Sequence, residues 1–163
     1  MSRYILARIA EDFNVDVSFA PKLFPDWNGS GCHTNYSTET MRQGTKGMEY
    51  IEGMMEKLAA KHKLHLSCYG TGNEARLTGK HETSSMEKFS YGVGNRGASF
   101  RIPTSTAQAG GAGYIEDRRP ASNIDAYVVA ALLIDTTLNE QSLAAPLVES
   151  YQAYVKEVTE ADN

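Results

Sequence analysis

The chain has 163 residues, 41% hydrophobic and 22% charged, which is the composition of a folded globular domain and excludes a chain that is disordered throughout. Its formal net charge is −4 with acids and bases intermixed, so it lacks the dense basic face that binding to nucleic acid requires. Apolar runs fall short of the roughly 18 residues that a membrane helix needs. We therefore expect no nucleic-acid partner and no membrane span.

The start of the sequence shows no targeting segment, because Arg3 and Arg8 interrupt its apolar residues. We expect a cytoplasmic protein, and an organelle stays open as an alternative. Two cysteines are too few for the disulfide framework of a secreted domain. Cys32 and Cys68 are therefore expected to be free thiols.

The first predicted elements are a helix and a strand. Apolar residues at helical spacing predict an amphipathic helix over residues 4–13, and Asn14 is a suitable end for it. Residues 15–19 alternate apolar with polar, which is the period of a half-buried strand, and Pro21 would end that strand.

The middle of the chain predicts a loop, a helix and a second strand. Residues 26–38 are rich in Gly, Asn, Ser and Thr and predict a loop. An apolar stripe over residues 46–62 predicts a helix, whose methionines we interpret as core residues. Alternation over residues 64–68 predicts the second strand.

The last part of the chain predicts a third strand and two helices. Phe100 and Ile102 flank Arg101 and indicate a strand in which Arg101 points away from its neighbours. Ser122 and Asp125 have the spacing of a capping box before a largely buried helix over residues 127–138. A terminal helix is expected from the apolar stripe at Leu147, Tyr151, Tyr154, Val155 and Val158, with Pro146 in its first turn.

The order of these elements decides the expected fold class. Because strands and helices do not alternate regularly, we expect an α+β fold with a largely antiparallel sheet and helices on one face. We expect two units along the chain: residues 1–138 form the main domain, and residues 139–163 form a helical tail.

Two polar segments in the first half of the chain are candidates for chemistry. In residues 26–37, DWNGSGCHTNYS, glycines permit close approach to a ligand and His33 can coordinate a metal. The alternative is a plain turn with a hydrogen-bonded histidine. In residues 73–85, NEARLTGKHETSS, Arg76 and Glu82 suit a mobile loop over a site, and the alternative is a solvated loop.

Two further segments bring arginines. Residues 91–103, YGVGNRGASFRIP, place Arg96 in a glycine loop and Arg101 on a strand, an arrangement that suits phosphate or carboxylate. Residues 114–120, YIEDRRP, place Glu116 in a cluster of charges, for which a solvated surface patch is the alternative. Together the four segments offer His33 and Glu116 as a metal pair beside several arginines, which fits phosphoryl transfer.

Four stretches occur in one order over residues 4–138: DWNGSGCHTN, RLTG with HETS, NRGAS with RIP, and YIEDRRPASN. In order and spacing they resemble the eukaryotic-type glutamine synthetases, in the carboxyl-terminal part of the catalytic domain. The resemblance implies that ATP phosphorylates the side-chain carboxylate of glutamate and that ammonia displaces phosphate to give glutamine. It also implies ATP and Mg²⁺ or Mn²⁺ as cofactors, and an oligomer of synthetase subunits.

The resemblance assigns a role to each matching position. It implies that His33 and Glu116 bind the metal and that Arg96, Glu82 and Arg76 are catalytic, with Glu82 taking a proton from the ammonium adduct. The implied glutamate-binding residues are Asp26, Trp27, Arg96 and Arg118. The implied nucleotide-binding residues are Asn35, Ser37, Arg96, Arg101, Tyr114, Ile115 and Glu116.

In this family further metal-binding glutamates lie upstream of the matched region, as does a small amino-terminal domain. Mg²⁺ requires nearly octahedral oxygen coordination, so His33 and Glu116 alone should bind it weakly. We therefore expect the isolated chain to be inactive until another synthetase subunit or an assembly partner supplies the missing part. The alternative function is a truncated, inactive synthetase-like domain that serves as an accessory subunit of a larger assembly.

Overall fold

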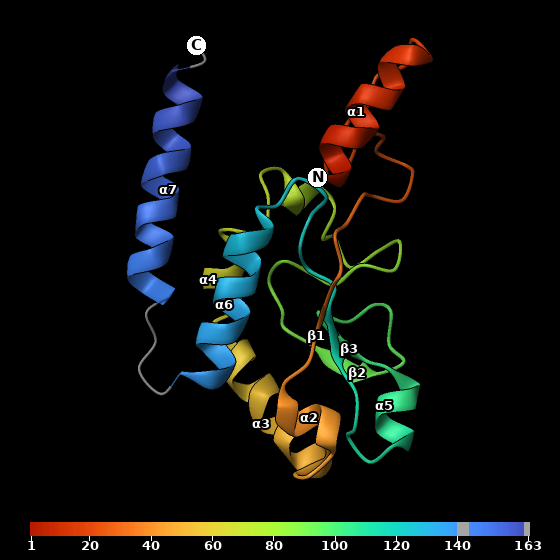
Figure 1. Cartoon of the computed structure of the whole chain (residues 1–163), viewed down its shortest axis with the longest axis vertical. Helices are drawn as coiled ribbons and strands as arrows, with labels where there is room; N and C mark the ends of the chain where they lie inside the picture. Colours follow the sequence, from red (N-terminus) through yellow and green to blue (C-terminus); the bar gives the residue numbers. More distant parts are fainter. Residues whose placement is uncertain (140–143, 162–163) are drawn as a thin grey trace.

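The computed structural model describes residues 1–139 and 144–161. Four short strands form one sheet in the order β1-β4-β3-β2, and Figure 1 shows it at the centre of the molecule. The strands are β1 (Thr34–Tyr36), β2 (Tyr91–Val93), β3 (Phe100–Ile102) and β4 (Ile115–Asp117). β4 pairs antiparallel with both β1 and β3, and β2 pairs parallel with β3. The expected α+β fold with a mostly antiparallel sheet is confirmed.

The helices differ widely in length and burial. They are α1 (Ser2–Asp12), α2 (Glu39–Gln43), α3 (Gly47–Ala60), α4 (His62–Leu66), the 3₁₀ helix η1 (Asn73–Ala75), α5 (Thr104–Gln108), α6 (Ala126–Leu138) and α7 (Ala144–Ala161). Within the described residues, no helix is long and apolar enough to span a membrane.

The hydrophobic core lies between the sheet and the helices α3 and α6. Register places Phe100 of β3 beside Asp117 of β4, so alternate residues of these strands face the core. Phe100 and Ile115 are fully buried there, against Ile51 of α3 and Leu132 of α6. The residues between them, Arg101 and Glu116, consequently face the opposite side of the sheet.

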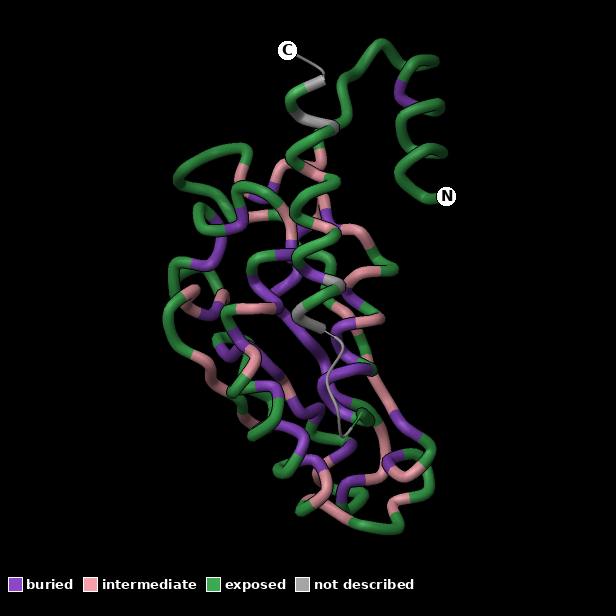
Figure 2. Tube along the Cα trace, turned by 90° about the vertical axis from the view of Figure 1, so that its left-hand side faces the viewer, coloured by how far each residue is buried: buried purple, intermediate pink, exposed green. Residues whose placement is uncertain are grey.

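α1 stands apart from the body of the domain, as Figures 1 and 2 both show. The guanidinium of Arg3 attaches it by donating to the carbonyls of Ser122 and Ile124, each at 2.6 Å. Of its residues only Ala10 is buried, so the predicted helix exists but its apolar side is open to solvent. The exposed apolar side chains of α1 and the next residue are Tyr4, Ile5, Leu6, Ile9 and Phe13.

Most predicted elements are confirmed at nearly the predicted limits: α1, α3 with its buried methionines, β3, α6 and α7. α6 is buried along one side only: Leu132 and Leu133 are buried, whereas Tyr127 at its start is 89% exposed. Its amino-terminal cap is Asp125 itself, whose carboxylate accepts from the amides of Tyr127 and Val128. The predicted capping box with Ser122 is wrong, since the Ser122 hydroxyl donates to the Phe19 carbonyl.

Two predicted strands are wrong. Residues 15–19 form no strand: Val15 is exposed, and they join no ladder of the sheet described above. Residues 64–68 begin inside α4 and continue into a turn. His62, His65 and Leu66 form the buried side of this helix. Over only a few residues, such a helical pattern cannot be distinguished from the alternation of a strand.

The predicted loop over residues 26–38 contains β1, because β4 provides a partner for its backbone. α7 rests on α6 and buries Val148, while Tyr151 packs partly against the core. The side chains of Leu147 and Val158, which belong to the predicted stripe, lie outside the part that the structure describes. Both cysteines are free, Cys32 exposed and Cys68 buried.

Candidate active site

The face of the sheet opposite the core carries one carboxylate surrounded by cationic groups. Arg101 lies opposite Glu116 across the β3–β4 pair, and Asn35 lies opposite Glu116 across the β1–β4 pair. His33 precedes β1 and shares the side of Asn35 because alternate residues of a strand share a face. Four of these side chains, His33, Arg101, Glu116 and Arg118, are called the Glu116 cluster below.

The distances within the Glu116 cluster are short. Nδ1 of His33 lies 3.1 Å from Oε1 of Glu116. Nε of Arg101 lies 2.6 Å, and Nη1 of Arg118 3.3 Å, from Oε2 of Glu116. The Glu116 side chain is only 8% exposed, so its negative charge requires these partners.

His33 has the protonation state that a metal ligand needs. Burial lowers the pKa of its imidazole below the ordinary value, and the nearby charge of Arg118 lowers it further, against the opposing effect of Glu116. The ring is therefore mostly neutral at pH 7, with a nitrogen lone pair available for a cation. The alternative of a hydrogen-bonded turn histidine is also met, since His33 contacts Glu116 directly.

A loop covers the Glu116 cluster on one side. Thr78 and Ser85 form an isolated antiparallel bridge at its base. At its tip Glu82 has a φ of 57°, a left-handed conformation that costs a residue with a side chain some strain. Arg118 donates from Nη2 to the Glu82 carbonyl at 3.3 Å and from Nε to the Arg96 carbonyl at 3.0 Å.

Glu82 and Arg96, whose carbonyls both accept from Arg118, also approach each other through their side chains. Nη1 of Arg96 lies 3.6 Å from Oε1 of Glu82, and both side chains are about three-fifths exposed, at 62% and 60%. The structure thus brings the predicted loop acid and the predicted glycine-loop arginine to one point beside the Glu116 cluster.

Arg76 lies beneath the loop that carries His33. It is 3% exposed, and its Nη2 donates to the carbonyls of Arg118 at 2.9 Å and Pro120 at 3.0 Å. Burial and the charge of Arg118 lower the pKa of its guanidinium to about 10. A Cβ on Gly31 would come within 2.6 Å of Arg76 Nη2, so a side chain at this position would displace the guanidinium.

The side chains of the other predicted binding residues make no hydrogen bond or ion pair with the cluster in the described part of the chain. The Ser37 hydroxyl donates to the Gly113 carbonyl at 2.6 Å, and Tyr114 is 36% exposed. Ile115 is fully buried in the core, so only its backbone is available to a ligand. Asp26 and Trp27 lie in an exposed loop, where Trp27 is 70% exposed.

The opposite face of β4 holds a second ionic group that the sequence analysis did not single out. Asp117 and Arg119 are fully buried, with Nη2 of Arg119 2.8 Å from Oδ2 of Asp117. Arg119 also lies within hydrogen-bonding distance of His62 and His65 and over the ring of Phe100, at 4.7 Å from its centroid. The solvated-patch alternative is therefore wrong for this pair. The sequence carried no signal for this pair, since its histidine partners lie more than 50 residues away along the chain.

The Glu116 cluster contains donor groups of the type that binds a divalent cation, but too few of them to complete a site. An imidazole and a carboxylate at 3.1 Å are a reasonable start of a metal site. Within residues 1–139 and 144–161, however, no group of three or more His, Cys, Asp or Glu side chains comes together. Mg²⁺ takes about six ligands, so this chain alone supplies part of a site.

Comparison with known proteins gives a consistent result. The family model "Glutamine synthetase, catalytic domain" matches residues 1–140. Glutamine synthetase of Yarrowia lipolytica is 58% identical over 137 residues, and that of Saccharomyces cerevisiae 57% identical over 137 residues. Glutamine synthetase cytosolic isozyme of Chlamydomonas reinhardtii is 57% identical over 139 residues.

These alignments cover 83–85% of this chain and only 36–37% of each relative, so the chain spans little more than a third of the length of the curated relatives it matches. The family match includes every residue of the Glu116 cluster and ends just before α7. The chain belongs to the glutamine synthetase family, as a part of its catalytic domain.

Proposed function

We propose that this chain supplies part of the active site of a glutamine synthetase. In the proposed reaction ATP phosphorylates the side-chain carboxylate of glutamate, and ammonia then displaces phosphate from the γ-glutamyl phosphate. The observation that carries the proposal is the Glu116 cluster, in which an imidazole, a carboxylate and two guanidinium groups meet on the open face of the sheet. Such a site neutralises charge, which is most of what phosphoryl transfer requires of a protein.

His33 and Glu116 are the residues that would bind Mg²⁺ or Mn²⁺. A divalent cation there would polarise an oxygen of the phosphate or of the glutamate carboxylate. The lowered pKa of His33 supports this role because a metal ligand must be unprotonated.

Arg101 and Arg96 are proposed to face phosphate, and Arg118 to bind the glutamate carboxylate. Each guanidinium has five donors, so the bonds that Arg118 makes to Glu116 and to two carbonyls leave it able to bind a further carboxylate. Glu82 is proposed to accept the proton of the ammonium adduct. Its exposed carboxylate on a loop beside Arg118 supports this role, since a closing loop would also exclude water.

The remaining roles follow the family and are proposed at the same positions. Asp26 and Trp27 would contribute to the glutamate pocket, and Arg76 would act near the transferred group by fixing the backbone of Arg118 and Pro120, to which it donates. The nucleotide would contact Asn35, Ser37, Tyr114 and the backbone of Ile115.

The remaining metal ligands are proposed to come from another chain or from another part of the same polypeptide. The exposed apolar side chains of α1 support this, because a contiguous apolar surface on a domain usually marks an interface. The same surface suits the second candidate function, an inactive accessory subunit. One relative is named a cytosolic isozyme, and we propose a cytoplasmic location for this chain too.

The test is reconstitution. The 163-residue chain would be co-expressed with the part of the yeast relative that it does not match. The purified complex would be assayed for γ-glutamyl hydroxamate with glutamate, hydroxylamine, ATP and Mg²⁺. We expect activity that His33→Ala and Glu82→Ala each reduce by at least about 100-fold, a typical contribution of a catalytic group.

Glu87→Ala is the matched control, because Glu87 is exposed, lies near the same loop and stands outside the cluster. Equal activity in the Glu82→Ala and Glu87→Ala complexes would reject the proposed role of Glu82. A stable complex that never makes hydroxamate would reject the synthetase proposal and favour the accessory subunit.

A further inference from the structure

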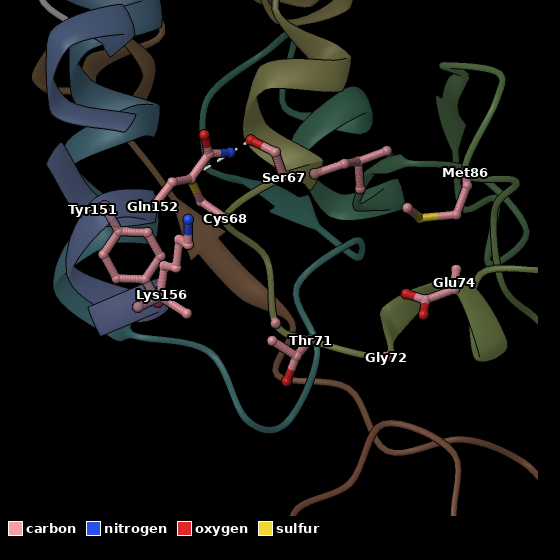
Figure 3. A pocket seen from close by; sticks show the side chains of 12 residues that line it. Ser67, Cys68, Thr71, Gly72, Glu74, Met86, Tyr151, Gln152 and Lys156 are labelled. Carbon is pink, nitrogen blue, oxygen red and sulfur yellow. Dashed lines mark hydrogen bonds between the residues drawn. The ribbon is translucent and has the colours of Figure 1, made fainter. Parts of the chain in front are cut away.

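A cavity of about 530 Å³ lies between α7 and the segment that follows α4, away from the Glu116 cluster. Figure 3 shows Tyr151, Gln152 and Lys156 of α7 on one side, with Glu74 and Met86 on the other. The volume is within the range of about 300–1,000 Å³ that small-molecule sites occupy. One wall comes from α7, which lies beyond the residues that the family model matches, so the family's active site does not account for this cavity.

The lining has an apolar middle and two opposite charges. Leu66, Met86, Tyr151 and Val155 provide aliphatic, thioether and aromatic surface. Lys156 stands beside Tyr151 on the α7 side, and Glu74 lies on the far side next to Met86 (Figure 3). A ligand that satisfies both walls therefore carries a negative group at one end, a positive group at the other and an apolar body between them.

Lys156 already has an acidic neighbour on α7, with which the carboxylate of such a ligand competes. Its Nζ lies 3.8 Å from Oε1 of Glu160, in a pair whose side chains are 76% and 68% exposed. Exposed pairs of this kind contribute little and exchange partners readily. The ammonium has three donors, so it can also bind a carboxylate in the cavity.

The floor of the cavity is a fixed loop. A Cβ on Gly70 would lie 2.2 Å from Oδ1 of Asn123 and 2.8 Å from Cβ of Ala121, so the backbone approaches closely here and has a φ of 98°. The Asn123 amide also donates to the Thr71 carbonyl at 3.0 Å, and the Asn73 amide donates to the Arg119 carbonyl at 2.8 Å. The loop that would touch the ligand is thus bonded to the segment that follows β4.

We infer that this cavity binds a small elongated zwitterion with an apolar body, of which a dipeptide with two apolar side chains is the simplest example. Its carboxylate pairs with Lys156, its amino group pairs with Glu74, and its side chains lie on Met86 and Tyr151. Because the floor of the cavity is bonded to the residues that follow β4, a bound ligand stabilises the position of that segment. The inference does not depend on the proposed function, since no member of the Glu116 cluster lines the cavity.

The test uses the 163-residue chain and L-leucyl-L-phenylalanine as the probe, with binding measured by isothermal titration calorimetry. We expect saturable binding that Lys156→Glu and Glu74→Lys each weaken at least tenfold. The double variant Lys156→Glu with Glu74→Lys should recover binding, because the dipeptide can enter in the reversed direction. Both positions are exposed, so we expect the exchange to leave the fold intact.

Three controls make the test decisive. Tyr154→Ala changes an exposed tyrosine on α7 outside the cavity and should leave the affinity unchanged, whereas Tyr151→Ala should weaken it. The N-acetylated, C-amidated dipeptide should bind at least tenfold more weakly than the free one. Equal binding of the capped dipeptide, or no saturable binding of the free dipeptide at millimolar concentration, would overturn the inference.

Discussion

The two faces of β4 hold two ion pairs of similar composition in opposite environments. Glu116 and Arg118 are 8% and 9% exposed and lie on the side of the sheet away from the core, where a 37% exposed imidazole and a loop complete their surroundings. Asp117 and Arg119 face the core, where both side chains are completely buried and aromatic rings surround the guanidinium. Because side chains alternate along β4, the Glu116–Arg118 pair and the Asp117–Arg119 pair lie on opposite faces, and only the first can exchange its partners for a ligand.

This separation has a physical purpose. A reacting site needs charged groups whose partners can be replaced by substrate. Because those partners change, such groups do not hold a strand in one position. A buried pair with saturated hydrogen bonds fixes the strand, because removing either partner leaves an uncompensated charge in the core. We interpret the Asp117–Arg119 pair as the group that positions Glu116 and Arg118 from behind.

The largest expected effect comes from breaking the buried pair. Arg119→Met should lower the free energy of unfolding by about 3–5 kcal/mol, since Asp117 would remain buried and unpaired. Arg118→Met on the other face should cost less, about 1–2 kcal/mol, because Glu116 keeps Arg101 and His33 as partners. Urea unfolding followed by circular dichroism measures both. Equal losses would contradict the contrast between the two faces.

The second prediction concerns the loss of folding stability at low pH. Burial and the charge of Arg119 lower the pKa of His65 to about 3, so the folded chain excludes a proton that the unfolded chain binds. Stability should therefore be complete above about pH 6.5 and fall as the pH decreases from 6.5 toward 3, by on the order of a few kcal/mol.

His65→Gln should flatten this pH dependence, whatever it does to stability at pH 7. His81→Gln, at an exposed loop position, is the matched control. Urea unfolding at several pH values measures the slope. An unchanged slope in His65→Gln would show that other groups dominate acid unfolding.

The third prediction concerns the effect of Arg118 on the pKa of His33. Nη1 of Arg118 lies 3.4 Å from Nδ1 of His33, and its charge lowers the pKa of the imidazole. Arg118→Met should raise the pKa of His33, because a repelling charge is removed. NMR titration of the His33 ring measures the change, with Arg8→Met on α1 as a remote control. A decrease would show that Arg118 acts on His33 mainly by other means.

The contrast between the faces also explains what the sequence could and could not predict. Long helices such as α3 and α6 were predictable, since their apolar period extends over more than three turns. The convergence of His33 with Glu116 was also expected, from the motifs, and the structure brings the two within 3.1 Å.

The three-residue strands were mostly missed because their pairing comes from distant segments. β1 lay inside a segment read as a loop, and β4 was read as a charge cluster. Propensity cannot show that residues 34–36 and 115–117 lie side by side. Burial of Arg119 was unpredictable for the same reason: its partners His62 and His65 are over 50 residues away, and single-sequence reasoning places most arginines at the surface.

The smallest expected effect belongs to the loop that closes the open face. The carboxylate of Glu82 lies 3.6 Å from Arg96, with both side chains mostly exposed, so Glu82→Gln should change the free energy of unfolding by less than about 0.5 kcal/mol. Glu116→Gln should cost several times more, because Glu116 is 8% exposed and compensates three partners. Urea unfolding of the two variants compares these costs directly. A large loss of stability in Glu82→Gln would contradict this prediction and mean that the loop contributes to the folded core. A negligible loss means that the Glu82 side chain does not stabilise the fold, and the strained left-handed backbone at Glu82 is then explained by its place at the site.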